Sequence, residues 1–176
     1  AELEQAGVVE GVITQNVDRL HTAAGSRRVV ELHGALADVR CLGCGAVEAR
    51  SDLQARLRSM NPGWADQHVE MAPDGDAELP TEIPEDFRIP TCTDCGGTLK
   101  PDVVFFGENV PEATVEAAWQ LWGDGEVLMV VGSSLTVWSG YRFVKKAAES
   151  MMPVVIVNLG ETRGDEEAWI RLEARA

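Results

Sequence analysis

The chain has 176 residues, 45% of them hydrophobic, and a formal net charge of −14. Its length suits one domain, or one domain that carries a smaller module, and its apolar fraction is that of a globular protein. The acidic balance argues against a nucleic-acid partner, because proteins that bind a phosphate backbone usually present a basic face. No apolar run approaches the about 20 residues that cross a bilayer, which argues against a membrane partner as well.

The first residues, AELEQAG, are typical of the end of a helix, with Gly7 placed to terminate it. The chain is therefore expected to begin inside an element, as a fragment would. This segment has no basic stretch followed by an apolar one, so no secretory signal is predicted. We expect a reducing compartment, either the cytoplasm or, if the source is eukaryotic, the mitochondrial matrix.

The first predicted strand covers residues 8–14 and ends in a group of polar side chains. Val12 and Ile13 are β-branched, as is usual in a buried strand. Four hydrogen-bonding side chains stand where this strand would reach the surface: Thr14, Gln15, Asn16 and Asp18. Either they hold a ligand, or they cap a helix that starts near Asp18. The residues alone leave both interpretations open.

A second extended run, RRVVELHG, covers residues 27–34 and ends in a His–Gly pair. Taken alone, a histidine such as His33 at a strand end is more often structural than catalytic. Further along, Ser51 is predicted to cap a short helix that ends at the Asn61–Pro62 pair.

An acidic, proline-containing stretch follows this helix. Eight carboxylate residues occur there without an intervening Lys or Arg: Asp66, Glu70, Asp74, Asp76, Glu78, Glu82, Glu85 and Asp86. This composition predicts a solvated and mobile loop. His68 is interpreted as a surface histidine and His21 as a loop histidine.

The second half alternates between strands and helices. Apolar strands are predicted at residues 102–107, 126–132 and 153–160, and helices from Pro111 and over residues 139–150. Strands that are apolar throughout and alternate with helices indicate an α/β fold with a parallel sheet covered on both faces. Ligands of such sheets bind beyond the carboxyl ends of the strands. Three strands end there in small or polar residues, which predicts a shared crevice: Gln15–Asn16, Gly132–Ser133–Ser134 and Asn158–Leu159–Gly160.

All four cysteines lie in two matched Cys-x-x-Cys pairs, Cys41 with Cys44 and Cys92 with Cys95. Each pair turns two thiolates to one side, and a glycine follows each pair, where the backbone must approach sulfur. Two such pairs form a closed tetrahedral site for structural zinc, with iron as the main competitor. The alternatives are two disulfides or a redox pair, and a reducing compartment argues against the disulfides.

Several motifs occur in the order that is found in one known family. They are TQNVDRLH, ELHG, the two Cys-x-x-Cys pairs, KPDVVFFGE, GSSLTV and VNLGETR, and the likeness covers nearly the whole chain, from about residue 3 to residue 167. On these motifs the chain resembles the sirtuins, the NAD-dependent protein-lysine deacylases. The long acidic stretch, VVFFGE and SSLTVWSGYRF are most similar to the bacterial and mitochondrial class II branch.

The resemblance implies a parallel, Rossmann-like sheet that binds NAD and an inserted zinc-ribbon module. The NAD-binding domain would comprise residues 1–37 and 99–176, and the zinc module with its acidic insertion residues 38–98. Sirtuins open with a glycine-rich GAGxS loop that holds the NAD pyrophosphate, and residues 1–176 contain no such loop. The chain is therefore expected to be the middle and late portion of a sirtuin, with weak NAD binding and no turnover when these residues are alone.

The reaction implied by the resemblance begins when the acyl-lysine oxygen attacks C1′ of the nicotinamide ribose. Nicotinamide leaves, and a general base then activates a ribose hydroxyl so that the acyl group passes from lysine to ADP-ribose. His33 matches the family's base, and an imidazole suits this role because its unperturbed pKa lies near neutral pH.

The resemblance also assigns binding roles. Gln15, Asn16 and Asp18 match the residues that hold nicotinamide and its ribose. Residues at the later strand ends match contacts to phosphate and ribose: Gly132, Ser133, Ser134, Asn158, Leu159 and Gly160. For residues 132–134 an ordinary strand-to-helix turn is the alternative. Arg163 is expected to flank the adenine.

Four residues match the strand along which sirtuins lay an acyl-lysine peptide by main-chain pairing: Val104, Phe105, Gly107 and Glu108. From the residues alone, Phe105 and Phe106 would belong to the core. The resemblance thus implies acyl-lysine proteins or peptides as substrates, with NAD and zinc as cofactors.

Two other functions fit parts of the sequence. A non-catalytic module would use the zinc ribbon and the sheet to recognise a peptide or an ADP-ribose-like ligand. A redox protein would use the cysteines as a reactive thiolate pair. The motifs specify neither the acyl group nor the oligomeric state.

Overall fold

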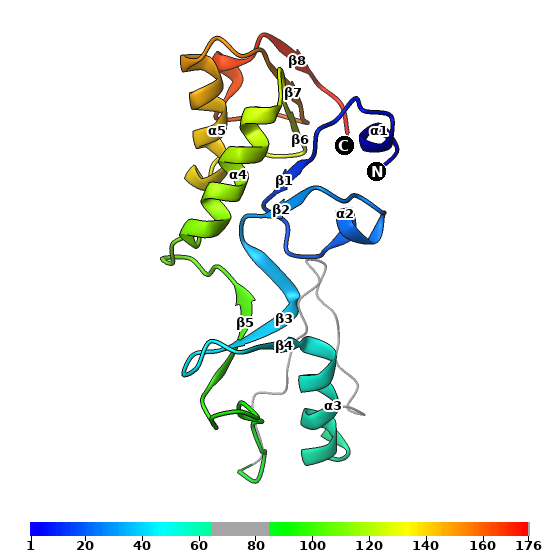
Figure 1. Cartoon of the computed structure of the whole chain (residues 1–176), viewed down its shortest axis with the longest axis vertical. Coiled ribbons are helices and arrows are strands. Elements are labelled where there is room, and N and C mark those ends of the chain that lie inside the picture. Colours follow the sequence, from blue (N-terminus) through cyan, green and yellow to red (C-terminus); the bar gives the residue numbers. More distant parts are fainter. Residues whose placement is uncertain (65–84, 176) are drawn as a thin grey trace. The chain divides into compact units, whose positions relative to one another are not determined.

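A computed structural model of the chain describes residues 1–64 and 85–175 (Figure 1). The chain divides into two compact units: unit 1 is Ala1–Gly34 with Val104–Ala176, and unit 2 is Ala35–Val103. The division into compact units does not show which ligand either unit binds, so the NAD-binding and zinc-binding roles of the predicted domains stay a prediction. Most of the predicted acidic loop, including His68, lies outside the described residues.

Unit 1 contains two parallel sheets. In the first, β1 (Val12–Thr14) pairs with β2 (Val29–Glu31). The second has the order β6 (Leu128–Val131), β7 (Val154–Val157), β8 (Ile170–Leu172). The helical elements of unit 1 are α1 (Glu2–Gln5), α2 (Leu20–Ala23), α4 (Glu112–Asp124), α5 (Trp138–Glu149) and the 3-10 helix η2 (Asp165–Glu167). Parallel strands that alternate with helices confirm the predicted α/β class.

Helix α5 contributes to both hydrophobic clusters of unit 1, and α4 and α5 lie against the strands (Figure 1). Val144 of α5 packs with Ile156 of β7, and both side chains are fully buried. Phe143, one residue earlier, packs with Leu32 and with Ala118 of α4. Burying a side chain of this size contributes about 1.5–3 kcal/mol. These contacts fix the start of α5 relative to the residues that follow β2.

The other face of the β6–β7–β8 sheet is half exposed. Its side chains alternate with those that enter the core, because successive residues of a strand point to opposite faces. Met129, Val131, Ile170 and Leu172 are 51–59% exposed. Within the described part of the chain this sheet is therefore covered on one face, and the prediction of cover on both faces is wrong.

The first strand is shorter than predicted. The N–H groups of Val8 and Val9 donate to the carbonyl oxygen of Leu3, at 2.9 and 3.2 Å. These amides therefore close the end of α1, and Gly7 adopts a φ of 69° there, as expected for a helix terminator. Strand pairing begins only at Val12.

A close approach of β1 to the chain before β2 requires glycine at position 11. A Cβ atom there would lie 2.6 Å from the carbonyl oxygen of Arg28 and 2.8 Å from Cδ1 of Leu121. The N–H of Val12 donates to the same carbonyl at 2.8 Å, so the backbone is held in place. Replacing Gly11 by alanine is expected to lower the free energy of unfolding by about 1–3 kcal/mol, as overpacking does.

Urea denaturation of the two glycine variants measures this difference. The matched control is Gly123→Ala in α4, where an added Cβ meets no atom within 4 Å. That substitution is expected to raise the free energy of unfolding by about 0.5–1 kcal/mol, because alanine loses less chain entropy than glycine. Equal stability of the two variants would contradict the close approach at position 11.

Unit 2 consists of a small sheet and one helix. The strand order is β4 (Val47–Ala49), β3 (Gly34–Cys41), β5 (Leu99–Val103), with β3 and β4 antiparallel. Arg40 Nε and Nη2 donate to Asp102 at 2.7 and 2.9 Å, which ties β3 to β5. The described residues of unit 2 bury few apolar side chains: Ala35, Val39, Cys41 and Cys92. So small a core predicts that unit 2 needs a further source of stability.

Helix α3 (Arg50–Met60) begins directly after β4, and its N-cap is Ala49 without a side-chain cap. The prediction that Ser51 caps this helix is wrong, because Ala49 ends the strand in an extended conformation and enters the helix at once. The predicted end is confirmed, since Asn61 Nδ2 donates to the carbonyl oxygen of Leu57 at 2.9 Å. Among the residues described, no helix has the length and apolar character to cross a membrane.

Candidate functional site

Two predicted site residues meet in unit 1, at the carboxyl ends of β1 and β2. Gln15 follows β1 and His33 lies just beyond β2. The Nδ1 atom of His33 lies 3.2 Å from the main-chain oxygen of Gln15, and Nε2 lies 2.8 Å from Oγ of Ser139. Gln15 Nε2 donates to the same Ser139 Oγ at 3.3 Å. We call His33, Gln15, Ser139 and Ser133 the His33 cluster.

Ser133 joins this cluster from the turn that follows β6. Its hydroxyl donates to Gln15 Oε1 at 3.4 Å and accepts from the N–H of Leu135 at 3.2 Å. Leu135 has a φ of 56° and is 4% exposed, so its burial in the core holds the turn in a conformation that leucine rarely adopts. The structure therefore brings two of the three predicted strand ends into contact.

Ser139 is the member of the cluster that sequence reasoning missed. It is the second residue of α5, in the segment WSGYRF. Gly140 follows it, and a Cβ at position 140 would lie 2.8 Å from Gln15 Oε1. The sequence did carry one signal for Ser139: it is a serine beside a glycine in the first turn of a helix, close after GSSLTV.

Asn16 and Asp18 are exposed at the end of β1. The main-chain N–H of Asn16 donates to Thr14 Oγ1 at 3.1 Å, and Asp18 Oδ1 accepts from the N–H of Leu20 at 3.0 Å. Leu20 is the first residue of α2, whose N-cap is Arg19 without a side-chain cap, so Asp18 closes the turn before the helix and does not cap it. A role of either residue in nicotinamide binding stays a prediction. His21 lies within α2 rather than in a loop.

The ends of β6 and β7 face a common hollow of about 460 Å³. Its lining consists of Gly132, Asn158, Leu159, Ala174 and Arg175. Gly132 has a φ of 60°, and Asn158 Nδ2 donates to the carbonyl oxygens of Leu159 and Gly160 at 2.8 and 3.2 Å. Three predicted cofactor-binding residues thus surround one open space.

Two further predicted contacts have other partners in the structure. Ser134 Oγ lies 3.0 Å from Thr136 Oγ1, within the turn after β6. The guanidinium carbon of Arg163 lies 4.2 Å from the ring centroid of Tyr141 and 5.6 Å from that of Trp138. Arg163 therefore stacks on aromatic side chains of α5, and a contact with adenine stays a prediction.

The segment Val104–Glu108, predicted as a strand, forms a turn. Strand β5 ends at Val103, and Gly107 adopts a φ of 90°. The N–H of Glu108 donates to the carbonyl oxygen of Phe105 at 3.0 Å. Phe105 is 48% exposed and Phe106 is fully exposed, so the interpretation of these two rings as core residues is wrong. The substrate-binding role of the segment is untested by this geometry.

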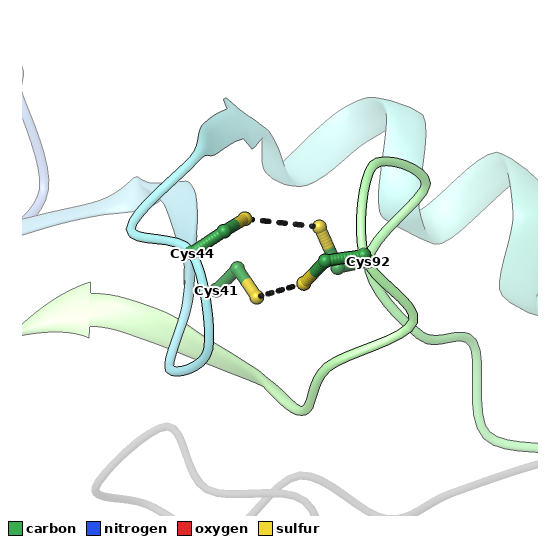
Figure 2. Close-up of side chains that lie close together, drawn as sticks. Cys41, Cys44 and Cys92 are labelled. Atoms are coloured by element: carbon green, nitrogen blue, oxygen red, sulfur yellow. Dashed lines mark hydrogen bonds between the residues drawn. The ribbon is translucent and has the colours of Figure 1, made fainter.

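The four cysteines of unit 2 come together at two loops, with their sulfur atoms turned toward one another (Figure 2). The Sγ atoms of Cys41 and Cys95 lie 3.5 Å apart, those of Cys44 and Cys92 3.7 Å apart, and all four lie within 4.8 Å of one another. None of the four cysteines is in a disulfide. A disulfide needs about 2.05 Å between sulfurs, whereas tetrahedral zinc with bonds of about 2.3 Å separates them by about 3.8 Å.

The surroundings of the sulfurs also fit a metal bound by thiolates. The backbone N–H of Cys44, helped by that of Gly43, lowers the pKa of Cys41 to about 6, whereas contacts with the other sulfurs raise the pKa of Cys44 and of Cys95. Both turns use a residue with positive φ after the second cysteine, Gly45 at 76° and Gly96 at 72°. A Cβ on Gly97 would lie 3.0 Å from Cys41 Sγ, so glycine is needed for the approach of the two loops. The cluster therefore fits structural zinc, and all four predicted ligands are brought together.

Comparison with known proteins places this geometry in a family. Residues 1–139 match the Sir2 family. The chain is 50% identical over 173 residues to an NAD-dependent protein deacetylase of Xanthomonas campestris, covering 98% of this chain and 59% of the relative. It is 49% identical over 175 residues to the NAD-dependent protein deacylase Sirt4 of Drosophila melanogaster, covering 99% and 56%.

A solved structure, Sir2 with a p53 peptide and NAD+, is 34% identical and superposes with a TM-score of 0.77. That match covers 99% of this chain and 61% of the other. The chain thus spans 56–59% of the length of these two relatives. Because the family match covers more than half of its residues, and the predicted motifs and cysteine cluster agree with it, the chain belongs to the Sir2 family, the sirtuins.

Proposed function

We propose that the full-length protein containing these residues is an NAD-dependent protein-lysine deacylase. It would move the acyl group from lysine to ADP-ribose and release nicotinamide. The observation that carries this proposal is the position of His33, whose two ring nitrogens are held between Gln15 and Ser139 at 3.2 and 2.8 Å. NAD is the co-substrate, supplying both the electrophilic ribose carbon and the acceptor of the acyl group.

The contacts of His33 favour one tautomer of the imidazole. The main-chain oxygen of Gln15 can only accept a hydrogen bond, so Nδ1 must carry the proton that it donates. Nε2 then presents a lone pair, which is the state that a general base requires. The hydrogen bond of Nδ1 keeps the imidazole ring oriented while Nε2 accepts a proton. This arrangement suits the activation of a sugar hydroxyl.

The co-substrate is proposed to bind along the strand ends of unit 1. Gln15, Asn16 and Asp18 offer the donors and acceptors that a carboxamide and a ribose need. The remaining proposed contacts are Gly132, Ser133, Ser134, Asn158, Leu159 and Gly160. Support comes from the contact of Ser133 with Gln15 and from the hollow that Gly132, Asn158 and Leu159 share. The proposed domains are residues 1–37 with 99–176 for NAD and 38–98 for zinc.

Acyl-lysine peptides are the proposed second substrate, by analogy with the relatives. The segment Val104, Phe105, Gly107 and Glu108 is proposed to meet the peptide backbone. The exposed rings of Phe105 and Phe106 support this, because apolar side chains in a surface turn are suited to binding. A cytoplasmic or mitochondrial-matrix location fits cysteines that serve as metal ligands.

Zinc is proposed to have a structural role only. Four cysteine ligands complete a tetrahedral shell, so no coordination position remains for a substrate. The cluster would supply the stability that the small core of unit 2 lacks.

Nicotinamide release by the full-length protein tests the proposed activity. The protein is incubated with NAD and an acyl-lysine peptide, and nicotinamide is measured by chromatography. Release is expected only when both NAD and the acylated peptide are present, and a peptide with unmodified lysine is the control. Binding of peptide or ADP-ribose without any release would favour the non-catalytic binding module instead. A reactive thiol pair that titrates before zinc chelation would favour the redox protein.

A further inference from the structure

We propose that Ser139 relays a proton from the attacking sugar hydroxyl to Nε2 of His33. This inference rests on the proposed deacylase function and adds a residue to its proton path. The observation behind it is the 2.8 Å contact between Ser139 Oγ and His33 Nε2, across 106 positions of sequence. Nε2 is thus in contact with a hydroxyl of the chain itself.

The hydrogen bonds of the His33 cluster have one consistent direction. The N–H of Leu135 donates to Ser133 Oγ, which donates to Gln15 Oε1. Gln15 Nε2 can only donate, and it does so to Ser139 Oγ at 3.3 Å. Each group therefore has its donor role assigned by its neighbour.

The last hydrogen bonds of this series fix the direction in which the hydroxyl hydrogen of Ser139 points. His33 Nδ1 donates to the main-chain oxygen of Gln15, so Nε2 of the neutral ring is an acceptor. The partner of Nε2 must then be a donor, and Ser139 Oγ is that donor. The serine hydrogen accordingly points at the nitrogen that is to receive a proton.

Ser139 Oγ has one lone pair left that can accept a hydrogen bond from a substrate. A serine hydroxyl has one hydrogen and two lone pairs. The hydrogen goes to His33 and one lone pair accepts from Gln15 Nε2, which leaves the second lone pair of Oγ. A sugar hydroxyl that donates to this lone pair completes a path of two protons.

The transfer along this path balances. The sugar O–H bond breaks as its proton moves to Ser139 Oγ, and the original serine proton moves to His33 Nε2. The sugar oxygen is left with the electron pair that forms its bond to the acyl carbon, Ser139 is again a neutral hydroxyl, and His33 is an imidazolium. No oxidant or further reactant is needed.

Two features of the structure keep Ser139 in this position. It lies in the first turn of α5, whose Phe143 is 4% exposed and packs with Leu32, next to His33 in sequence. Gly140 leaves room for the Gln15 side chain, which a Cβ at position 140 would meet at 2.8 Å. The helix and the histidine are thus tied to the same hydrophobic cluster.

The test compares Ser139→Ala with Ser139→Thr in the full-length protein under single-turnover conditions. Ser139→Ala is expected to slow deacylation by about 10²-fold, within the range for a lost proton-transfer group. Its NAD affinity and its nicotinamide release in the first step are expected to be unchanged. Ser139→Thr keeps a hydroxyl and is expected to retain the wild-type rate.

Rates in mixtures of H₂O and D₂O supply a measurement that a merely structural role would not alter. Two protons in motion give a curved dependence on deuterium fraction in the wild type and in Ser139→Thr, and one proton gives a straight line in Ser139→Ala. A wild-type rate in Ser139→Ala, equal losses in both variants, or a straight line for the wild type would overturn the relay. Absence of nicotinamide release from the wild type would instead overturn the proposed function.

Discussion

Replacing His33 by alanine in the full-length protein is expected to slow deacylation by about 10²- to 10⁴-fold, as the loss of a general base does. NAD binding is expected to remain, because the proposed base would act on a hydroxyl of a co-substrate that is already bound. The side chain contacts only Gln15 and Ser139 among the hydrogen bonds described, so its removal leaves the strand pairs intact. Single-turnover deacylation and NAD titration calorimetry measure the two effects separately.

The matched control for this variant is His21→Ala. His21 is a partly buried histidine of α2, outside the His33 cluster, and its loss is expected to leave the rate unchanged. Wild-type turnover in His33→Ala would exclude this residue as the base. Loss of both NAD binding and turnover in His33→Ala would support the structural interpretation of a histidine at a strand end.

Replacing Cys92 by alanine is expected to release zinc and to unfold unit 2. The remaining three sulfurs cannot close a tetrahedral shell, and the described part of the unit has few other buried apolar side chains. Zinc binding contributes about 10–16 kcal/mol to the folding of small zinc peptides, far more than a core of this size. Elemental analysis measures the metal, and hydrogen exchange followed by mass spectrometry measures the loss of protection in Ala35–Val103.

Leu42→Ala is the control in the same loop. Leu42 lies between the first two cysteines and is 64% exposed, so its truncation is expected to leave both zinc content and protection unchanged. Undiminished zinc in Cys92→Ala would contradict the four-cysteine site. Zinc loss without any loss of protection would show that unit 2 folds by its own packing.

The features that the sequence predicted well depend on local patterns. Two Cys-x-x-Cys pairs define the geometry of their own turns, so the metal site needed only that the two turns meet, as they do at β3 and before β5. Apolar runs such as residues 154–157 predict buried strands by composition, and β7 follows that prediction. Gln15 and Ser133 were predicted to share a crevice because parallel strands end at the same edge of a sheet, and their side chains do meet.

The features that the sequence did not predict depend on tertiary contacts. Ser139 reaches His33 only because α5 packs beside Leu32, and no local pattern records that contact. The amides of Val8 and Val9 return to Leu3, which overrides their β propensity. Phe105 and Phe106 look like core residues by composition, yet a turn at Gly107 exposes both rings.

The products formed from an acyl-lysine peptide and NAD test the central claim most directly. Mass spectrometry of the reaction of the full-length protein should detect deacylated peptide, nicotinamide and acyl-ADP-ribose in equal amounts, because the proposed reaction moves the acyl group to a sugar hydroxyl of ADP-ribose. In His33→Ala, deacylated peptide and acyl-ADP-ribose should form about 10²- to 10⁴-fold more slowly, while nicotinamide release in the first turnover should remain, because the proposed base acts after nicotinamide has left. Release of the acyl group as a free carboxylate without consumption of NAD would contradict the assignment of His33 and the strand ends of unit 1 to NAD-dependent acyl transfer.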